Sequence, residues 1–388
     1  MPTPAKLSDA ERDLRWTAIC DLMVTSDVDV VIGHSDLGDK TGYQRYISGY
    51  RSFFGDVASM LFSDRSSAMV VTNPGVVMFA KQLSWIENIV VGMDAKPWLV
   101  GDGVDTPVMS GTSVGEELGK QLCEHGATRI GLADMERFPG EWRDAIAAAI
   151  PDCTFVDLRA GFNQLRLVKS AEELDNIRAS CGVADEIWAD MANIAQVGRA
   201  EFEVLADIEH RIRLAGGEDS YNMFFSLPMF ASPVESMPSA KVVQPGDTYI
   251  IEVSPRCNGY YGQETALVSF GPLDPEMRAA YDAINRARDR GVAQMRAGND
   301  ITDVVAAIDQ QLTVDGYELA SPLIGHFVGL ELEEPRVGAD SFMLEAGMVF
   351  ICHPFIAGWP ALMRADTYLI GVDGVERLTT LPLEAMEI

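Results

Sequence analysis

Apolar positions along the first 160 residues alternate between short β-type runs and longer helical stripes. Runs of aliphatic and β-branched residues predict strands at 28–32, 68–72, 75–79, 129–132 and 155–158. Amphipathic segments, the first behind a capping signal, predict helices at about 8–23, 116–125 and 141–150. Strands that alternate with helices are typical of an α/β fold, and we expect such a domain over residues 1–163.

Residues 164–388 show a different order, with long helices first and most strands later. Gly161–Lys169 is the predicted linker, and a capping box at Ser170–Glu173 opens a long amphipathic helix. Further helices are expected at about 200–214, 275–296 and 302–314, a loop at 221–238, and strands at 326–332, 348–352 and 367–372. This order predicts an α+β domain.

The segment 245–267 predicts a hairpin. Thr248–Val253 is rich in β-branched and aromatic residues, and Asn258-Gly259 is a strong two-residue turn signal. The hairpin would hold Glu252, Gln263 and Glu264 on neighbouring strands. Because an unpaired carboxylate is costly in an apolar run, Glu252 needs a metal, a cation, a proton or a substrate beside it.

Composition and charge narrow the class of protein. The chain has 388 residues, 47% of them apolar and 23% charged, with no run near the ~20 apolar residues of a membrane span. With no signal-peptide pattern at the N-terminus, we expect a cytoplasmic location. The net charge of −28 disfavours nucleic acid as a partner and indicates a solvated acidic surface. Six dispersed cysteines without zinc spacing indicate reduced thiols.

Several short motifs, in the same order, resemble the creatinase / prolidase / methionine aminopeptidase group, also called M24, with its pita-bread fold. They are Tyr46-Ile-Ser-Gly49, Leu167–Glu173, Gly246-Asp247 with Glu252, Gly325–Leu332, Gly347–Phe350 with Pro354, and Asp366-Thr367. The resemblance covers nearly the whole chain. It implies an α/β N-terminal domain, a pita-bread C-terminal domain at 164–388, and a homodimer in which the N-terminal domain covers the partner's pocket.

The resemblance also implies where metal ligands would lie. Metallopeptidases of this group hold two metal ions with two Asp, one His and two Glu. The corresponding positions here hold Glu252, Gln263, His326, His353 and Ala365. Hard divalent ions need several anionic oxygens, so this set predicts no dinuclear site and no cofactor. Glu252, Gln263, His326 and His353 remain an alternative set for one zinc or other divalent ion.

The expected function is therefore that of a creatinase-like, metal-independent hydrolase of a non-peptide C–N bond in a small polar molecule. The candidate catalytic residues are His326, His353, Glu252 and Glu264. The candidate substrate-binding residues are Glu235, Gln263, Asp56, Phe54, Tyr260 and Arg364. Structural roles remain open for several of them, including packing for Tyr260 and ion pairing for Arg364. A lyase that abstracts a proton and a non-catalytic small-molecule-binding protein are the alternatives, and a dinuclear-metal Xaa-Pro aminopeptidase is the least favoured.

Overall fold

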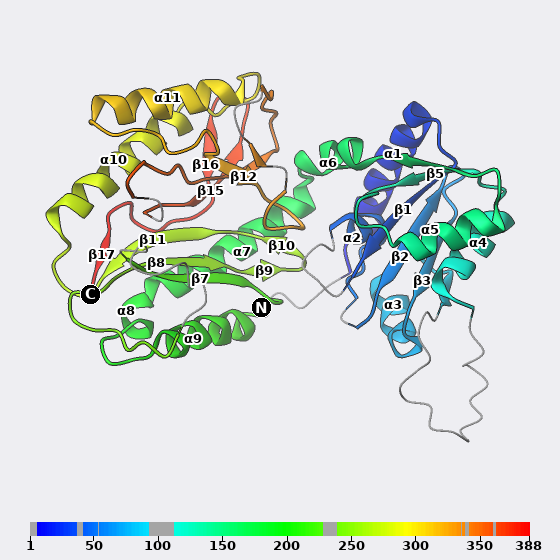
Figure 1. The fold of residues 1–388 in the computed structure, drawn as a ribbon, viewed down its shortest axis with the longest axis horizontal. Helices are drawn as coiled ribbons and strands as arrows, with labels where there is room; N and C mark the ends of the chain where they lie inside the picture. The colour runs from blue at the N-terminus through cyan, green and yellow to red at the C-terminus, as the bar shows by residue number, and fades with distance from the viewer. Residues whose placement is uncertain are drawn as a thin grey trace. The chain divides into compact units, whose positions relative to one another are not determined.

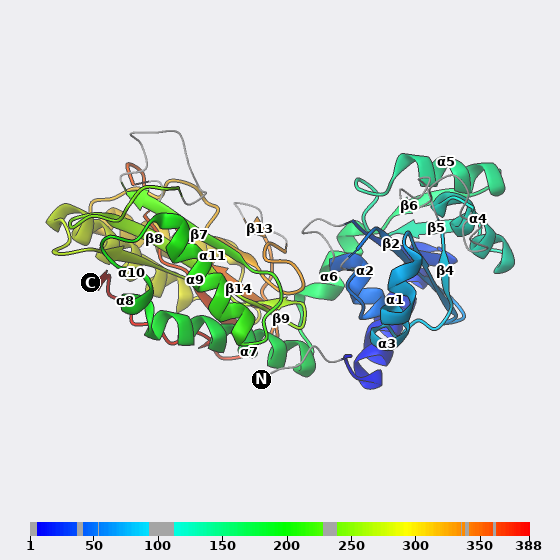
Figure 2. The ribbon, with the colours of Figure 1, turned by 90° about the horizontal axis from the view of Figure 1, so that it is seen from below.

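The computed structural model of the chain describes residues 6–36, 42–52, 54–92, 112–227, 239–334, 336–337, 341–359 and 362–388. These residues form two compact units, which divide between Arg166 and Leu167. Each unit has its own sheets and its own apolar core (Figures 1 and 2).

The N-terminal unit alternates helices with strands. Its elements are α1 (Asp9–Ser26), β1 (Val30–Ser35), α2 (Gly42–Ser48), β2 (Val57–Phe62), β3 (Ser67–Val71), the 3₁₀ turn η1 (Pro74–Val76), α3 (Val77–Leu83), β4 (Ile89–Val91), α4 (Val114–Glu124), β5 (Arg129–Leu132), α5 (Gly140–Ala149), β6 (Thr154–Asp157) and α6 (Arg159–Leu167).

One mixed sheet forms the centre of this unit, in the order β4-β3-β2-β1-β5-β6. β1 pairs in parallel with β5 and antiparallel with β2. Helices α4 and α5 pack against one face, where Leu118 and Ile146 join the core around Val30. Helix α2 lies on the other face, where the Gln44 side chain donates to the Ser59 hydroxyl at 2.9 Å. This arrangement confirms the predicted α/β domain.

The C-terminal unit begins with helices and continues with two sheets. Its elements are α7 (Ala171–Ala189), α8 (Met191–Ile194), α9 (Glu201–Leu214), β7 (Tyr221–Leu227), β8 (Thr248–Ser254), β9 (Arg256–Cys257), β10 (Tyr260–Tyr261), β11 (Glu264–Ser269), α10 (Pro275–Val292), α11 (Ile301–Val314), β12 (Gly325–Phe327), β13 (Arg336–Val337), β14 (Val349–Cys352), β15 (Asp366–Ile370), β16 (Val375–Arg377) and β17 (Met386–Glu387).

The two principal sheets of this unit have the orders β17-β11-β8-β7 and β13-β12-β14-β15-β16. Alternate residues of β8 face opposite cores: Ile251 packs with α7–α9, whereas Ile250 packs with α10, α11 and the second sheet. The sheets meet where Thr265 and Ala365 exchange backbone hydrogen bonds of 3.0 and 3.2 Å. The predicted α+β domain is therefore confirmed.

Several local predictions differ from the structure. The predicted strand at 75–79 is the turn η1 followed by α3, and the predicted linker is the helix α6. The expected loop at 221–238 begins with β7, and its remainder lies outside the described residues. Strand β2 was not predicted at all, although its six residues are buried. In these cases pairing or packing with distant segments overrides the local pattern.

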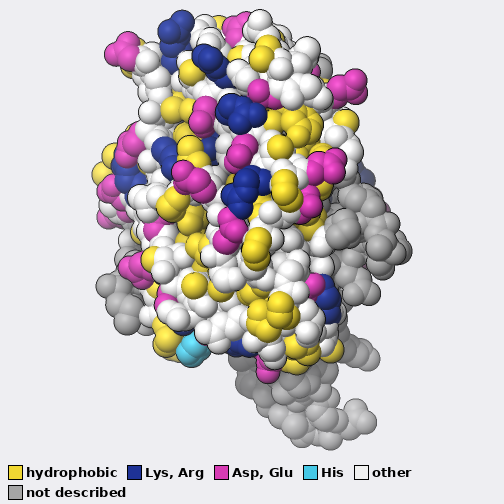
Figure 3. Space-filling view, turned by 90° about the vertical axis from the view of Figure 1, so that its left-hand side faces the viewer, with side chains coloured by type: hydrophobic (Ala, Val, Ile, Leu, Met, Phe, Trp, Pro, Cys, Tyr) yellow, Lys and Arg dark blue, Asp and Glu magenta, His cyan; other side chains and the backbone are white. Residues whose placement is uncertain are grey.

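Charged side chains of both signs are interspersed across the face of the molecule drawn in Figure 3. The excess of acidic residues over basic residues does not gather into one acidic field on that face. Among the residues described, no helix combines the length and apolarity needed to cross a membrane.

Candidate active site

The predicted hairpin turn forms as the sequence indicates. Cys257 pairs with Tyr260, and the loop residues Asn258 and Gly259 have φ values of 46° and 95°. Positive φ at both loop positions favours Asn-Gly and matches the right-handed twist of the strands. Beyond this turn, β8 and β11 pair so that Glu252 lies opposite Thr265.

Strand alternation places Gln263 and Glu252 on the same face of the sheet. Gln263 precedes β11, and its backbone is held by Thr367, whose hydroxyl accepts from the Gln263 N–H at 3.1 Å and donates to the Gln263 carbonyl at 2.8 Å. The Gln263 side chain hydrogen-bonds to the carboxyl group of Glu252, to which the Ser254 hydroxyl also donates, at 3.1 Å. The two positions predicted from the hairpin are therefore neighbours.

His326 lies on β12 and His353 directly follows β14, the neighbouring strand of the second sheet. β12 pairs with β14, and the two imidazole rings lie with centroids 5.1 Å apart. Gly325, just before His326, has a φ of +153°, and a Cβ atom there would lie 1.9 Å from the carbonyl oxygen of Ile351. The close pairing that positions His326 therefore requires glycine at 325.

We expect Gly325→Ala to destabilise the protein by about 3 kcal/mol, because the added methyl group forces β12 away from β14. Urea denaturation followed by circular dichroism measures the change. Gly182→Ala is the matched control, since Gly182 is helical and a Cβ atom there meets nothing within 4 Å. Equal stability of the two variants would show that β12 and β14 accommodate the added methyl group at little energetic cost.

These side chains line one cavity of about 390 Å³. Glu252, Gln263, His326 and His353 all contribute to its wall, and Glu333 provides a second carboxylate. The other lining residues are Tyr221, Met223, Ser321, Leu323, Gly325, Leu332, Phe355 and Met363. The cavity therefore combines two carboxyl groups and two imidazoles with an apolar wall.

Glu252 is the most perturbed carboxyl group of this cavity. Its side chain is buried, and burial raises its pKa to about 7, with the charge of Glu333 adding to the rise. Hydrogen bonds from Ser254 and Gln263 act in the opposite direction. Glu252 therefore exchanges its proton near neutral pH, as a general base or acid requires.

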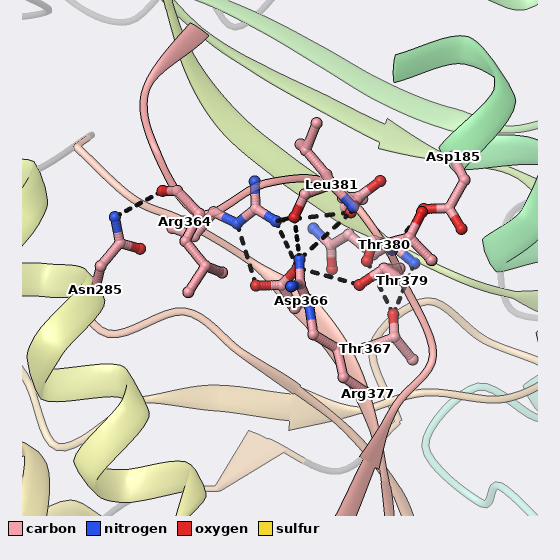
Figure 4. A network of polar contacts seen from close by, with 12 residues as sticks. Asp185, Asn285, Arg364, Asp366, Thr367, Arg377, Thr379, Thr380 and Leu381 are labelled. Carbon is pink, nitrogen blue, oxygen red and sulfur yellow. Dashed lines mark hydrogen bonds and ion pairs between the residues drawn. The ribbon is translucent and has the colours of Figure 1, made fainter. Parts of the chain in front are cut away.

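Glu264 and Arg364 do not line this cavity. Glu264 faces the opposite side of its strand, where its carboxylate accepts from the Leu381 N–H at 3.0 Å and lies 3.6 Å from Arg364. Arg364 is fully buried, and its guanidinium group donates hydrogen bonds of 2.6 and 3.1 Å to the carboxylate of Asp366 (Figure 4). The strand alternation of β11 accounts for the position of Glu264, and pairing with Asp366 accounts for that of Arg364.

Asp366 is the centre of that buried network. Arg288 and Arg377 also contact its carboxylate, at 2.7 and 2.6 Å, and the Thr379 hydroxyl donates at 3.1 Å. Burial opposes the charge, but the guanidinium groups of Arg364 and Arg288 lower the pKa of Asp366 to about 2. The network therefore joins the start of β15 to α10 and β16.

Among the other predicted substrate contacts, those that the structure describes do not line this cavity. Tyr260 is fully buried, and its hydroxyl donates to Glu173 at 2.9 Å, which is a packing role. Phe54 and Asp56 belong to the N-terminal unit. Glu235 lies outside the described residues. Conversely, Tyr221 and Phe355 line the cavity without having been predicted, because neither their residue type nor their spacing marks them as site residues.

The sequence model of metallopeptidase family M24 matches residues 175–373, just over half of the chain. The chain therefore belongs to the metallopeptidase family M24, a family of hydrolases, as its motifs predicted.

Named relatives agree with this assignment. The chain is 28% identical over 232 residues to a Xaa-Pro dipeptidase of Pyrococcus furiosus, a match that covers 57% of this chain and 66% of that protein, just under two thirds of its length. It is 25% identical over 309 residues to a Xaa-Pro dipeptidase of Lactobacillus delbrueckii subsp. lactis. That match covers 77% of this chain and 80% of the relative. The X-Pro aminopeptidase of Thermotoga maritima has a similar structure, with a TM-score of 0.80. The similarity covers 96% of this chain and 99% of that one, at 21% sequence identity, and shows that the two share a fold.

These comparisons correct the predicted function. The expectation of a creatinase-like, metal-independent hydrolase of a non-peptide C–N bond is wrong, because the family is one of metallopeptidases and the relatives above are named for Xaa-Pro peptides. The prediction that no cofactor is needed is wrong for the same reason.

The described residues nevertheless do not fit the family's pair of metal ions. Gln263 offers a neutral amide and Ala365 offers no donor, so Glu252 alone carries a carboxylate among the five ligand positions. Across the described ranges, no group of three or more His, Cys, Asp or Glu side chains is arranged to hold a metal ion, and this includes the set predicted for a single ion. The steps proposed below use only side chains of this chain.

Proposed function

We propose that the protein hydrolyses an amide bond of a small peptide or peptide-like substrate in the cavity that Glu252 lines. The observation that carries this proposal is a buried carboxyl group with a pKa of about 7 in a cavity shared with two imidazoles. Membership of the metallopeptidase family and relatives named Xaa-Pro dipeptidases support a peptide-like substrate. The cytoplasmic location and the homodimer remain predictions.

Glu252 is the proposed general base. Its carboxylate removes a proton from water, and the resulting hydroxide adds to the carbonyl carbon of the amide. The tetrahedral intermediate collapses when the C–N bond breaks and the protonated Glu252 returns its proton to the leaving nitrogen. The products are one carboxylic acid and one amine, so the water is fully consumed.

His326 and His353 are the residues proposed to stabilise the tetrahedral intermediate. Both imidazoles line the same cavity as Glu252, and the His326 ring is largely buried. An N–H donor that is already oriented stabilises the negative charge that develops on the carbonyl oxygen. His326 lies on β12 and His353 directly follows β14, so the paired backbone of these two strands positions both rings.

Turnover of dipeptides tests the proposal. We expect release of amino acids from a panel that includes Phe-Pro and Phe-Ala, with kcat/KM rising through pH 7 and levelling above it, because Glu252 acts only when deprotonated. Chromatography of products from pH 5 to 9 provides the measurement. Parallel assays with added Mn²⁺, and metal content per chain by mass spectrometry, show whether an ion contributes. No turnover in either condition, or a flat profile between pH 5 and 9, would refute the proposal.

A further inference from the structure

We propose that the buried ion pair of Lys169 and Glu334 positions the loop 328–334 against the substrate cavity. Lys169 does not line the cavity, so it acts as a positioning residue through Glu334. The inference rests on the proposed function, because it takes this cavity as the place where substrate binds. It adds to the site a residue that lies outside the cavity wall.

The loop 328–334 joins β12 to β13 and supplies Leu332 and Glu333 to the cavity wall. The structure describes every residue of this loop, and they form neither helix nor strand. Because no regular backbone ladder fixes Leu332 and Glu333, their positions depend on the contacts that hold the loop in place.

Lys169 and Glu334 form a close ion pair that is shielded from water. The Lys169 ammonium lies 2.7 Å from the Glu334 carboxylate, and only 1% and 2% of the two side chains are exposed. Moving two charges out of water is costly, so a buried pair often stabilises a fold no better than an apolar pair of the same size. The attraction is recovered only in a close arrangement, however. The pair therefore fixes the position of Glu334 relative to Lys169.

Glu334 carries this constraint to the cavity wall. Its backbone N–H donates to the carbonyl of Phe327 at 2.9 Å, so the end of the loop folds back onto β12. A Cβ atom at Gly329 would lie 2.5 Å from a carboxylate oxygen of Glu334, which shows how closely this carboxylate packs on the backbone of the loop. The loop is thus closed around the Glu334 side chain, and the wall residues Leu332 and Glu333 directly precede Glu334.

The start of the loop has separate contacts with the hairpin of β9 and β10. The Tyr261 N–H donates to the Gly329 carbonyl at 3.0 Å, and the buried guanidinium of Arg256 donates to the Leu330 carbonyl at 3.3 Å. These contacts do not involve Lys169. Loss of the ion pair should therefore release the end of the loop, which forms the cavity wall, while the start of the loop and the hairpin keep their positions.

Hydrogen–deuterium exchange followed by mass spectrometry tests this positioning without requiring turnover. The main variant is Lys169→Met/Glu334→Leu, which removes both charges together and replaces the ion pair by an apolar pair, so that the fold is retained. We expect its melting temperature to stay close to the native value, and amide exchange in residues 330–334 to become about tenfold faster. Exchange in residues 256–262, on the hairpin, should not change.

Dipeptide kinetics connect the loop to the site. In the same double variant, KM for the best dipeptide of the panel should rise about tenfold while kcat changes less than about twofold, because the loop contributes binding but no reacting group. Lys120→Met is the matched control: it removes an ammonium that lies 3.5 Å from Glu117 on α4, where 59% of the Lys120 side chain is exposed. This control should alter neither the exchange nor KM.

Glu334→Gln provides the decision if the double variant does not fold. It keeps the shape of the side chain but removes the charge that Lys169 contacts, so exchange in residues 330–334 should rise by a smaller factor. Native exchange of this segment in either variant, faster exchange throughout the C-terminal unit, or a native KM in the double variant would overturn the inference. The expected change in exchange, in a protein that cleaves no dipeptide, would contradict only the proposed function.

Discussion

Replacement of Glu252 by Gln is expected to lower kcat by about 10²–10⁴-fold, the range typical for loss of a general base. The substitution keeps the shape and most hydrogen-bonding capacity of the side chain but removes its ability to accept a proton from water. The step in the pH profile near pH 7 should disappear together with the activity. Steady-state kinetics with the best dipeptide of the panel, from pH 5 to 9, measures both effects.

Stability separates this catalytic effect from simple unfolding. Because burial disfavours the charge of Glu252, the neutral Gln should leave the melting temperature unchanged or slightly raised at pH 8. Glu264→Gln is the matched control: it alters a buried carboxyl group on the neighbouring strand that faces away from the cavity. Its kcat should change little. If Glu252→Gln retained more than a tenth of the native kcat, Glu252 would not be the base.

Replacement of Asp366 by Asn is expected to destabilise the protein by about 3–5 kcal/mol, as loss of one partner from a buried ion network does. The carboxylate is fully buried and contacts Arg288, Arg364 and Arg377, so the variant leaves three guanidinium groups around a neutral amide. Two of these arginines are themselves fully buried. Urea denaturation at pH 7 measures the difference.

The control for this variant is Asp289→Asn. Asp289 also contacts Arg288, at 3.3 Å, but 55% of its side chain is exposed. Exposed ion pairs contribute about 0–1 kcal/mol, so this variant should unfold close to the native midpoint. Similar stabilities for the two variants would mean that the three arginines do not depend on the Asp366 charge.

Features with a short-range cause were predictable from the sequence. The capping box at Ser170 forms with both of its hydrogen bonds, and the Asp274 side chain caps α10 from the position directly before it. The turn at Asn258-Gly259 has the predicted positive φ values. In each case the chemistry resides in two to four consecutive residues, so no knowledge of the rest of the fold is needed.

Features with a long-range cause were not predictable. β7 begins in a segment rich in Phe, Met and Pro that was expected to be a loop, and it becomes a strand because it pairs with β8 over seven residues. Glu333 was not among the residues predicted for the site, because its place in the cavity wall depends on how the loop after β12 folds back. Phe355 and Met363 line the cavity from the segment between β14 and β15, and their positions likewise depend on how that segment folds.

The candidate site shows the same division. Glu252, Gln263, His326 and His353 were identified from the order of short motifs, and all four line one cavity. Glu264, Tyr260 and Arg364 were placed near the site by proximity in sequence alone. Their side chains point into packed or ion-paired surroundings, which only the strand register and the sheet-to-sheet contact determine.

The hairpin of β8 and β11 buries a carboxyl group on each of its faces, and folding therefore takes up protons. Burial raises the pKa of Glu252 to about 7 and that of Glu264 to about 8, against the roughly 4.3 of an unfolded glutamate. The stability that these raised pKa values provide is complete below the unfolded pKa and is lost as the pH rises through the folded values. The rise in pH that turns Glu252 into a base therefore also removes the contribution that these two carboxyl groups make to the stability of the domain.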